Sequence, residues 1–147
     1  MEAPLLFEVL KTLGNNNSQG EYYLTDVLAK LRGMGKKVGG VVTADSEMIM
    51  GVNSRRQLAE AESVMRRRIL EKLMDDGVTV MDPASTFIEK SVKIAPDTVI
   101  YPYTWIQGNT VIGEDCEIGP NVRMENVKVA GGCRLQFAHV HDCEIKN

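Results

Sequence analysis

The 147-residue sequence has little net charge, few cysteines and no long apolar run. Its formal charge of −3 and isoelectric point near 5.4 argue against a general nucleic-acid binder, which usually carries a basic face. No stretch reaches the length that spans a bilayer, and the opening Met-Glu-Ala-Pro is unlike a signal peptide. Three cysteines, an odd number, favour free thiols in the cytoplasm. We therefore expect a cytoplasmic protein without nucleic-acid or membrane partners.

The second half of the chain carries a six-residue repeat. Residues two apart lie on one face of a strand, and small or β-branched residues stand two positions before each repeated apolar residue. Turn residues such as those at 113–115 and 119–121 separate these pairs. The period predicts a parallel β-helix in which three hexads close one triangular coil. The repeated apolar residues are Ile88, Ile94, Ile100, Ile106, Ile112, Ile118 and Met124.

Every third repeat should stack in one inward column, and after Met124 the register slips by one residue. No charged residue falls in a predicted column. A β-sandwich of short strands is the alternative, but it expects turns about every 8–12 residues rather than every six. The three predicted columns are Ile88, Ile106, Met124 and Val140; Ile94, Ile112, Val129 and Ile145; and Ile100, Ile118 and Leu135.

The first 80 residues are predicted to be rich in helix. Apolar spacing predicts helices at about 4–13 and 20–32, and a weak strand at 38–44. A long helix is predicted at about 54–76, where Ser54 and Gln57 fit a capping box. One strand is too little for a doubly wound sheet. We therefore expect the end of an α/β domain at 1–80 and the β-helix at 81–147.

Three separated motifs resemble a known family. They are NNNSQGEYYLTD at 15–26, GVNSRRQL at 51–58 and GVTVMDPAST at 77–86, and the hexapeptide region follows them. Together they resemble the bacterial bifunctional N-acetylglucosamine-1-phosphate uridyltransferase / glucosamine-1-phosphate acetyltransferase. The resemblance covers almost the whole chain, but only an inner portion of the family. That portion is the end of the uridyltransferase domain, the linking helix and the first coils of the acetyltransferase β-helix.

The resemblance implies an α+β chain: a helical C-terminal remnant of an α/β nucleotidyltransferase domain, followed by a left-handed parallel β-helix. The general rule for parallel crossovers gives a right-handed connection, so the left hand rests on the resemblance alone. The resemblance also implies a homotrimer formed along the β-helix. The family makes UDP-N-acetylglucosamine, a cell-wall precursor, with Mg²⁺ clamping the phosphates.

The parts that carry the family's chemistry have no counterpart here. The family holds its triphosphate on a glycine-rich loop with Arg and Lys. The nearest stretch, at 32–37, follows a helix and is expected to stop it. The acetyl-CoA and sugar-phosphate residues of the family belong to later coils. We therefore expect this chain alone to be inert, with sugar nucleotide and Mg²⁺ bound only if the absent parts are supplied.

Asn53 is the one site residue that the resemblance carries over. In the family, the Asn of the GVN motif helps to bind Mg²⁺ and the sugar nucleotide. Mg²⁺ usually needs a carboxylate or phosphate besides an amide oxygen, so Asn53 alone should not hold it. Its alternative role, which we favour, is a helix-capping or turn residue beside Ser54.

His139 and His141 flank the inward Val140, so both should point outward as surface histidines. Cys143 should point inward, which argues against a metal ion shared with them. Cys116 and Cys133 should stack in one column within disulfide range, but a reducing compartment favours free core thiols.

The arginine run at 66–68 lies on the predicted long helix. Acidic residues three to four positions away favour local salt bridges over a phosphate or RNA site. The expected partners are Glu60, Glu62, Glu71 and Asp75.

Two functional hypotheses remain from the sequence. The chain is a piece or short relative of the bifunctional enzyme, or it is a non-catalytic module whose β-helix assembles a trimer. The sequence stops part-way through a coil at Asn147, which would leave an open strand edge. On both hypotheses we expect an assembled chain rather than a monomer.

Overall fold

The computed structural model describes residues 3–146 and divides into two compact units, which meet in sequence between Ala44 and Asp45. The first unit holds two short helices, α1 (Ala3–Leu10) and α2 (Asp26–Gly33). They pack around a small apolar cluster of Val9, Val27 and Leu31. Both predicted helices are therefore present, but the second begins at Asp26, because residues 20–23 have no regular structure and residues 24–25 form a turn.

The predicted strand at 38–44 is wrong. Residues 36–43 have no regular structure, and the side chains of Val41 and Val42 are 100% and 95% exposed. A strand is stabilised by a hydrogen-bonded neighbour, and none of the described strands pairs with this segment. Gly39 and Gly40 further weaken it, because glycine loses more backbone entropy on ordering than other residues.

The second unit begins with a 3₁₀ turn, η1 (Ser46–Ile49), and the long helix α3 (Arg55–Asp75). The predicted cap forms in part: the Gln57 amide donates to Ser54 Oγ at 3.2 Å. The Gln57 side chain reaches one residue beyond the N-cap and accepts the Asn53 amide at 2.8 Å. The C-terminal half of α3 packs on the β-helix through Leu70 and Leu73. Nearer the start of α3, the apolar side chains of Leu58 and Met65 are exposed to solvent.

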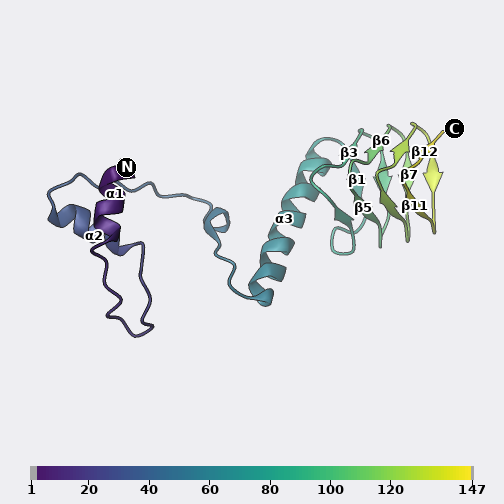
Figure 1. Ribbon diagram of the computed structural model, residues 1–147. Coiled ribbons are helices and arrows are strands. Elements are labelled where there is room, and N and C mark those ends of the chain that lie inside the picture. The colour runs from purple at the N-terminus through teal and green to yellow at the C-terminus, as the bar shows by residue number, and fades with distance from the viewer. Residues whose placement is uncertain (1–2, 147) are drawn as a thin grey trace. The chain divides into compact units, whose positions relative to one another are not determined.

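The β-helix consists of three parallel four-stranded sheets that run along its length (Figure 1). Their orders are β1-β4-β7-β10, β2-β5-β8-β11 and β3-β6-β9-β12. This parallel solenoid matches the left-handed hexapeptide β-helix that the resemblance implies. The strands are β1 (Thr79–Val80), β2 (Phe87–Ile88), β3 (Lys93–Ile94), β4 (Val99–Ile100), β5 (Trp105–Gln107), β6 (Val111–Ile112), β7 (Glu117–Ile118), β8 (Arg123–Glu125), β9 (Lys128–Val129), β10 (Arg134–Leu135), β11 (His139–His141) and β12 (Glu144–Ile145).

All three predicted columns are confirmed by the strand register. For example, Ile112 pairs with Ile94 on one side and Val129 on the other. Val80 lies outside the predicted columns, but it pairs with Ile100 and extends the third column by one coil. The strand β1 is thus part of the first coil. The expected domain boundary at 80/81 remains a prediction.

Buried threonines fill the smaller inward positions without leaving polar atoms unpaired. Thr86, Thr98, Thr104 and Thr110 are fully buried, and each hydroxyl donates to a backbone carbonyl at 2.6–2.8 Å. Two of these hydroxyls also accept a backbone amide from the next coil: Thr98 from Cys116, and Thr110 from Val127. A buried hydroxyl is tolerated when it is hydrogen-bonded, so threonine can alternate with valine and cysteine here.

The coil corners need left-handed backbone. One corner column holds Gly108 and Asn126, whose φ values are +65° and +54°. Asn126 also accepts the Asn109 amide at 3.0 Å, which ties two coils together. Glycine and asparagine adopt this conformation at the lowest cost. Among the described residues, no helix combines the length and the apolar character needed to cross a membrane.

Candidate functional site

Asn53, the carried-over site residue, lies in the exposed loop between η1 and α3. Its backbone amide donates to Gln57 Oε1 at 2.8 Å, one residue before the N-cap Ser54. The backbone of Asn53 therefore has the role that we favoured, as part of the turn that caps α3. The family's site role for the Asn53 side chain stays a prediction.

The loop before Asn53 is held to α3 by ion pairs. Arg67 contacts Glu47 at 2.6 Å, and Arg68 contacts Asp45 at 2.8 Å and Glu47 at 3.0 Å. Hydrogen bonds from these two arginines hold the pKa of Glu47 below its usual range. Asp45 also caps η1 by accepting the Glu47 amide at 3.1 Å. The arrangement fixes the approach of the loop to the start of α3.

The arginine run at 66–68 forms salt bridges, as predicted, but most of its partners are not the predicted ones. Of the predicted acidic neighbours, Glu71 contacts Arg67 at 3.9 Å. The shorter pairs go to Asp45 and Glu47, some twenty residues earlier in the chain. Helical spacing could identify the first contact but not the pairs that depend on how the preceding loop folds back.

The residues around Asn53 do not by themselves fit a Mg²⁺ site. Mg²⁺ prefers near-octahedral oxygen ligands and usually binds through one or two carboxylates plus phosphates. The carboxylates of Asp45 and Glu47 are held by arginines. Within residues 3–146, no three His, Cys, Asp or Glu side chains gather closely enough to hold a metal ion. One amide is then an insufficient donor set.

A second candidate surface, which the sequence analysis missed, follows the outer face of the sheet β2-β5-β8-β11. The rings of Phe87 and Trp105 stack at 4.7 Å. Arg66 lies over Phe87 at 4.5 Å, and Arg123 lies over Trp105 at 5.6 Å. We call these four residues the aromatic ladder. The signal was present in the sequence, because Phe87 and Trp105 are eighteen residues apart, which is one full coil.

Two exposed aromatic residues extend the surface of the ladder at a coil corner. Tyr103 and Phe137 are 68% and 74% exposed and have φ values of +58° and +48°. Asn121 occupies the same corner of the intervening coil at φ +56°. A bulky side chain in left-handed backbone is unfavourable, whereas asparagine tolerates it. Tyr103, Trp105, Asn121 and Phe137 together line one shallow depression.

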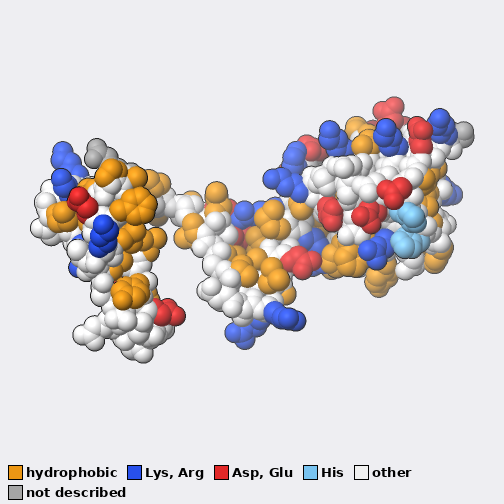
Figure 2. Space-filling view, in the orientation of Figure 1, with side chains coloured by type: hydrophobic (Ala, Val, Ile, Leu, Met, Phe, Trp, Pro, Cys, Tyr) orange, Lys and Arg blue, Asp and Glu red, His pale blue; other side chains and the backbone are white. Residues whose placement is uncertain are grey.

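His139 and His141 point outward, as predicted, and lie at the surface of the β-helix (Figure 2). Their rings are 6.3 Å apart, and His141 Nδ1 lies 3.4 Å from Asp142. Cys143 was predicted to point inward, but its side chain is exposed. It lies in the last described coil, which no further described coil covers.

Cys116 and Cys133 are both buried thiols, so the prediction of core thiols is confirmed. Cys116 Sγ lies 3.2 Å from the Ala130 carbonyl oxygen, a hydrogen-bonding contact. Burial, together with the neighbouring Cys116, raises the pKa of the Cys133 thiol. A buried thiol with a raised pKa is a poor nucleophile, so the pair contributes packing rather than reactivity.

The solenoid with its six-residue period defines the class of protein. Residues 85–126 match the family described as bacterial transferase hexapeptide (six repeats). This match covers most of the first coils and agrees with the register of the three sheets.

Relatives extend the likeness over nearly the whole chain. The chain is 54% identical to the bifunctional protein GlmU of Caldanaerobacter subterraneus subsp. tengcongensis, over 94% of this chain and 30% of the relative. It is 49% identical to the protein of that name from a Geobacillus species, over 97% of this chain and 31% of the relative. It is 47% identical to the protein of that name from Alkaliphilus oremlandii, over 99% of this chain and 32% of the relative. These values confirm the resemblance inferred from the three motifs, and the chain spans about a third of the length of these relatives.

Proposed function

We propose that this chain forms the linking region of an enzyme that makes UDP-N-acetylglucosamine in the cytoplasm. In this proposal, residues 1–80 end a uridyltransferase domain and the β-helix begins an acetyltransferase domain. The supporting observation is the continuity of α3 with the first coil, where Leu70 and Leu73 join the β-helix core. Such packing would hold the linking helix against the start of the acetyltransferase domain.

The chain alone is then inert in both reactions. Uridylyl transfer requires a phosphate cradle and Mg²⁺, and the surroundings of Asn53 offer a single amide with two arginine-bound carboxylates. We expect no release of pyrophosphate from UTP with N-acetylglucosamine-1-phosphate, and no release of free thiol from acetyl-CoA with glucosamine-1-phosphate. Turnover well above a no-protein control in either assay would contradict this part of the proposal.

Asn53 is proposed to act only in the complete enzyme. There its amide oxygen would help to bind Mg²⁺ and the sugar nucleotide at the end of the loop that Arg67 and Arg68 hold. Asn53→Ala in such an enzyme should lower uridylyl transfer and leave acetyl transfer unchanged. Equal loss of both activities would instead indicate a structural role for Asn53 at the start of α3.

A second function, trimer assembly through the β-helix, is favoured by the aromatic ladder. Aromatic residues and arginine are enriched at the energetically dominant positions of protein interfaces. Tyr103 and Phe137 are exposed in backbone that disfavours them, so stability of the single chain does not account for their presence. We propose that this face packs against a second copy of the chain in a homotrimer.

Light scattering coupled to size exclusion tests the assembly. We expect a trimer mass for the chain and a smaller mass for Trp105→Ala combined with Phe137→Asn. The second change places at the corner the residue type already found at Asn121, so it should not lower the melting temperature. Val111→Ala, on another face and 42% exposed, is the control and should remain trimeric. A monomeric wild-type chain, or a trimeric double variant, would contradict this assignment.

A further inference from the structure

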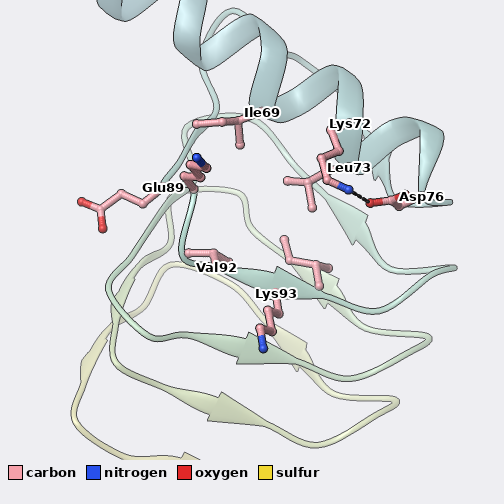
Figure 3. A pocket seen from close by; sticks show the side chains of 9 residues that line it. Ile69, Lys72, Leu73, Asp76, Glu89, Val92 and Lys93 are labelled. Atoms are coloured by element: carbon pink, nitrogen blue, oxygen red, sulfur yellow. Dashed lines mark hydrogen bonds and ion pairs between the residues drawn. The ribbon is translucent and has the colours of Figure 1, made fainter. Parts of the chain in front are cut away.

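A groove of about 360 Å³ lies between α3 and the first coil of the β-helix. Ile69 and Leu73 come from the underside of α3, and Val92 lies opposite them near β3 (Figure 3). Ile94 completes the apolar floor. Small-molecule sites typically have volumes of roughly 300–1,000 Å³ and are mostly apolar, with a few polar groups that fix orientation. The groove has the size and the lining of such a site.

The charges at its rim leave a positive excess. The Lys72 ammonium is paired with Asp76 at 2.9 Å, so these two charges cancel. The Glu89 carboxylate accepts the Gly108 amide at 2.8 Å, and its side chain points away from the apolar floor (Figure 3). Lys90 and Lys93 also line the groove, and neither has an ion-pair partner among residues 3–146.

We propose that this groove binds a small amphipathic anion. The apolar body of the ligand would lie between Ile69, Leu73 and Ile94, and its carboxylate or phosphate would meet Lys90 and Lys93 at the rim. A charge-assisted hydrogen bond from lysine to an anionic oxygen is stronger than a neutral one. A cationic ligand is disfavoured, because Asp76 is paired with Lys72, and Glu89 accepts the Gly108 amide with its side chain turned away from the apolar floor.

The site is separate from the proposed catalytic function. It is distinct from the loop at Asn53, and its lining comes from α3, the turn at 89–92 and β3. A ligand that touches both walls would also stabilise the packing of α3 on the β-helix, because a molecule that binds only the folded state raises its stability.

The test uses three matched probes that differ in head group: 4-phenylbutyrate, 4-phenylbutanol and 4-phenylbutylamine. Methyl-labelled protein is titrated with each and followed by NMR. We expect saturable shifts of the Ile69, Leu73, Val92 and Ile94 methyl groups with the carboxylate. The alcohol should bind about tenfold more weakly, the factor that corresponds to losing one charge-assisted contact. The amine should cause no saturable shift.

Surface variants identify the head-group contacts. Lys93→Gln and Lys90→Gln should each weaken 4-phenylbutyrate binding, and the double variant more so. Lys128→Gln is the matched control. Lys128 lies on the same outward column as Lys93, two coils along, and outside the groove. Equal binding of the amine and the carboxylate, shifts centred on other methyl groups, or unchanged affinity in the double lysine variant would each overturn the proposal.

Discussion

Ile112 illustrates what one inward position contributes. It is 1% exposed in the middle of a column, whereas its neighbour Val111 on the same strand is 42% exposed. Ile112→Asp would bury an unpaired charge, which we expect to cost roughly 4 kcal/mol or more of unfolding free energy. Val111→Asp makes the same chemical change on the outer face and should cost much less. Thermal denaturation compares the two, and a melting temperature of Ile112→Asp close to wild type would refute the column.

Gly113 is required for a different reason, which is the close approach of two coils. A Cβ atom at this position would lie 2.5 Å from the Gly131 nitrogen and 2.7 Å from its Cα. Both atoms are backbone, so they cannot move aside cheaply. We expect Gly113→Ala to destabilise the β-helix by about 1–3 kcal/mol. Gly51→Ala, where the nearest atom is 3.9 Å away, is the control for denaturant unfolding. Equal stability of the two variants would exclude the clash.

These two residues differ in how far sequence could predict them. The role of Ile112 follows from the six-residue period, because each coil repeats the same inward position. The turn at Gly113 could be predicted as well, but its contact with Gly131 could not. Ile112 pairs with Val129, so Ala130 follows in register, and the close approach of Gly113 to Gly131 depends on how the backbone turns at this corner.

At the scale of elements, the segment before α3 depends on charge. The pKa of Glu47 is lowered by hydrogen bonds from Arg67 and Arg68, so the ionised carboxylate favours the folded loop. Its contribution is present above the ordinary pKa of a glutamate and is lost as the pH falls toward the lowered value. We expect the loop at 45–53 to loosen in acid before the β-helix does. A pH titration followed by NMR measures both effects: the chemical shift of the Glu47 carboxyl carbon reports its pKa, and the amide shifts of residues 45–53 report the loosening of the loop.

Arginine variants separate this local effect from general acid sensitivity. In Arg67→Gln, the pKa of Glu47 should move up toward its ordinary value, and the loop should loosen at a higher pH. Arg66→Gln is the matched control, because the Arg66 guanidinium lies over Phe87 rather than against Glu47. A Glu47 titration that Arg67→Gln leaves unchanged would show that the ion pair does not set its pKa.

The candidate site was predictable where its contacts are local. Ser54 and Gln57 are three residues apart, and the Gln57 amide donates to Ser54 Oγ as the sequence predicted. The pairing of Arg68 with Asp45 spans twenty-three residues and depends on the fold of the loop. The aromatic ladder obeys the same period on the outer face, since Phe87 and Trp105 are one coil apart. The prediction of a weak strand at 38–44 was wrong because an apolar pattern does not show whether a neighbouring strand is present to pair with it.

At the scale of the whole molecule, the chain has two apolar clusters of unequal size. The first unit has a cluster of three buried residues, whereas the second has a continuous core that runs along the β-helix. A solenoid gains stability from each stacked coil, while a cluster of three residues supplies little. The two units should therefore differ in their resistance to local unfolding.

Limited trypsin digestion tests this difference. Lys36 and Lys37 are exposed in a segment without regular structure, between α2 and η1. We expect the first cuts there, because cleavage requires local unfolding and this backbone is already extended and open. The product that begins near Val38 should keep the melting transition of the β-helix. Lys36→Gln with Lys37→Gln should slow the first cut, whereas Lys90→Gln should not. Early fragments that end within 78–146 would mean that the coils open before the first unit does.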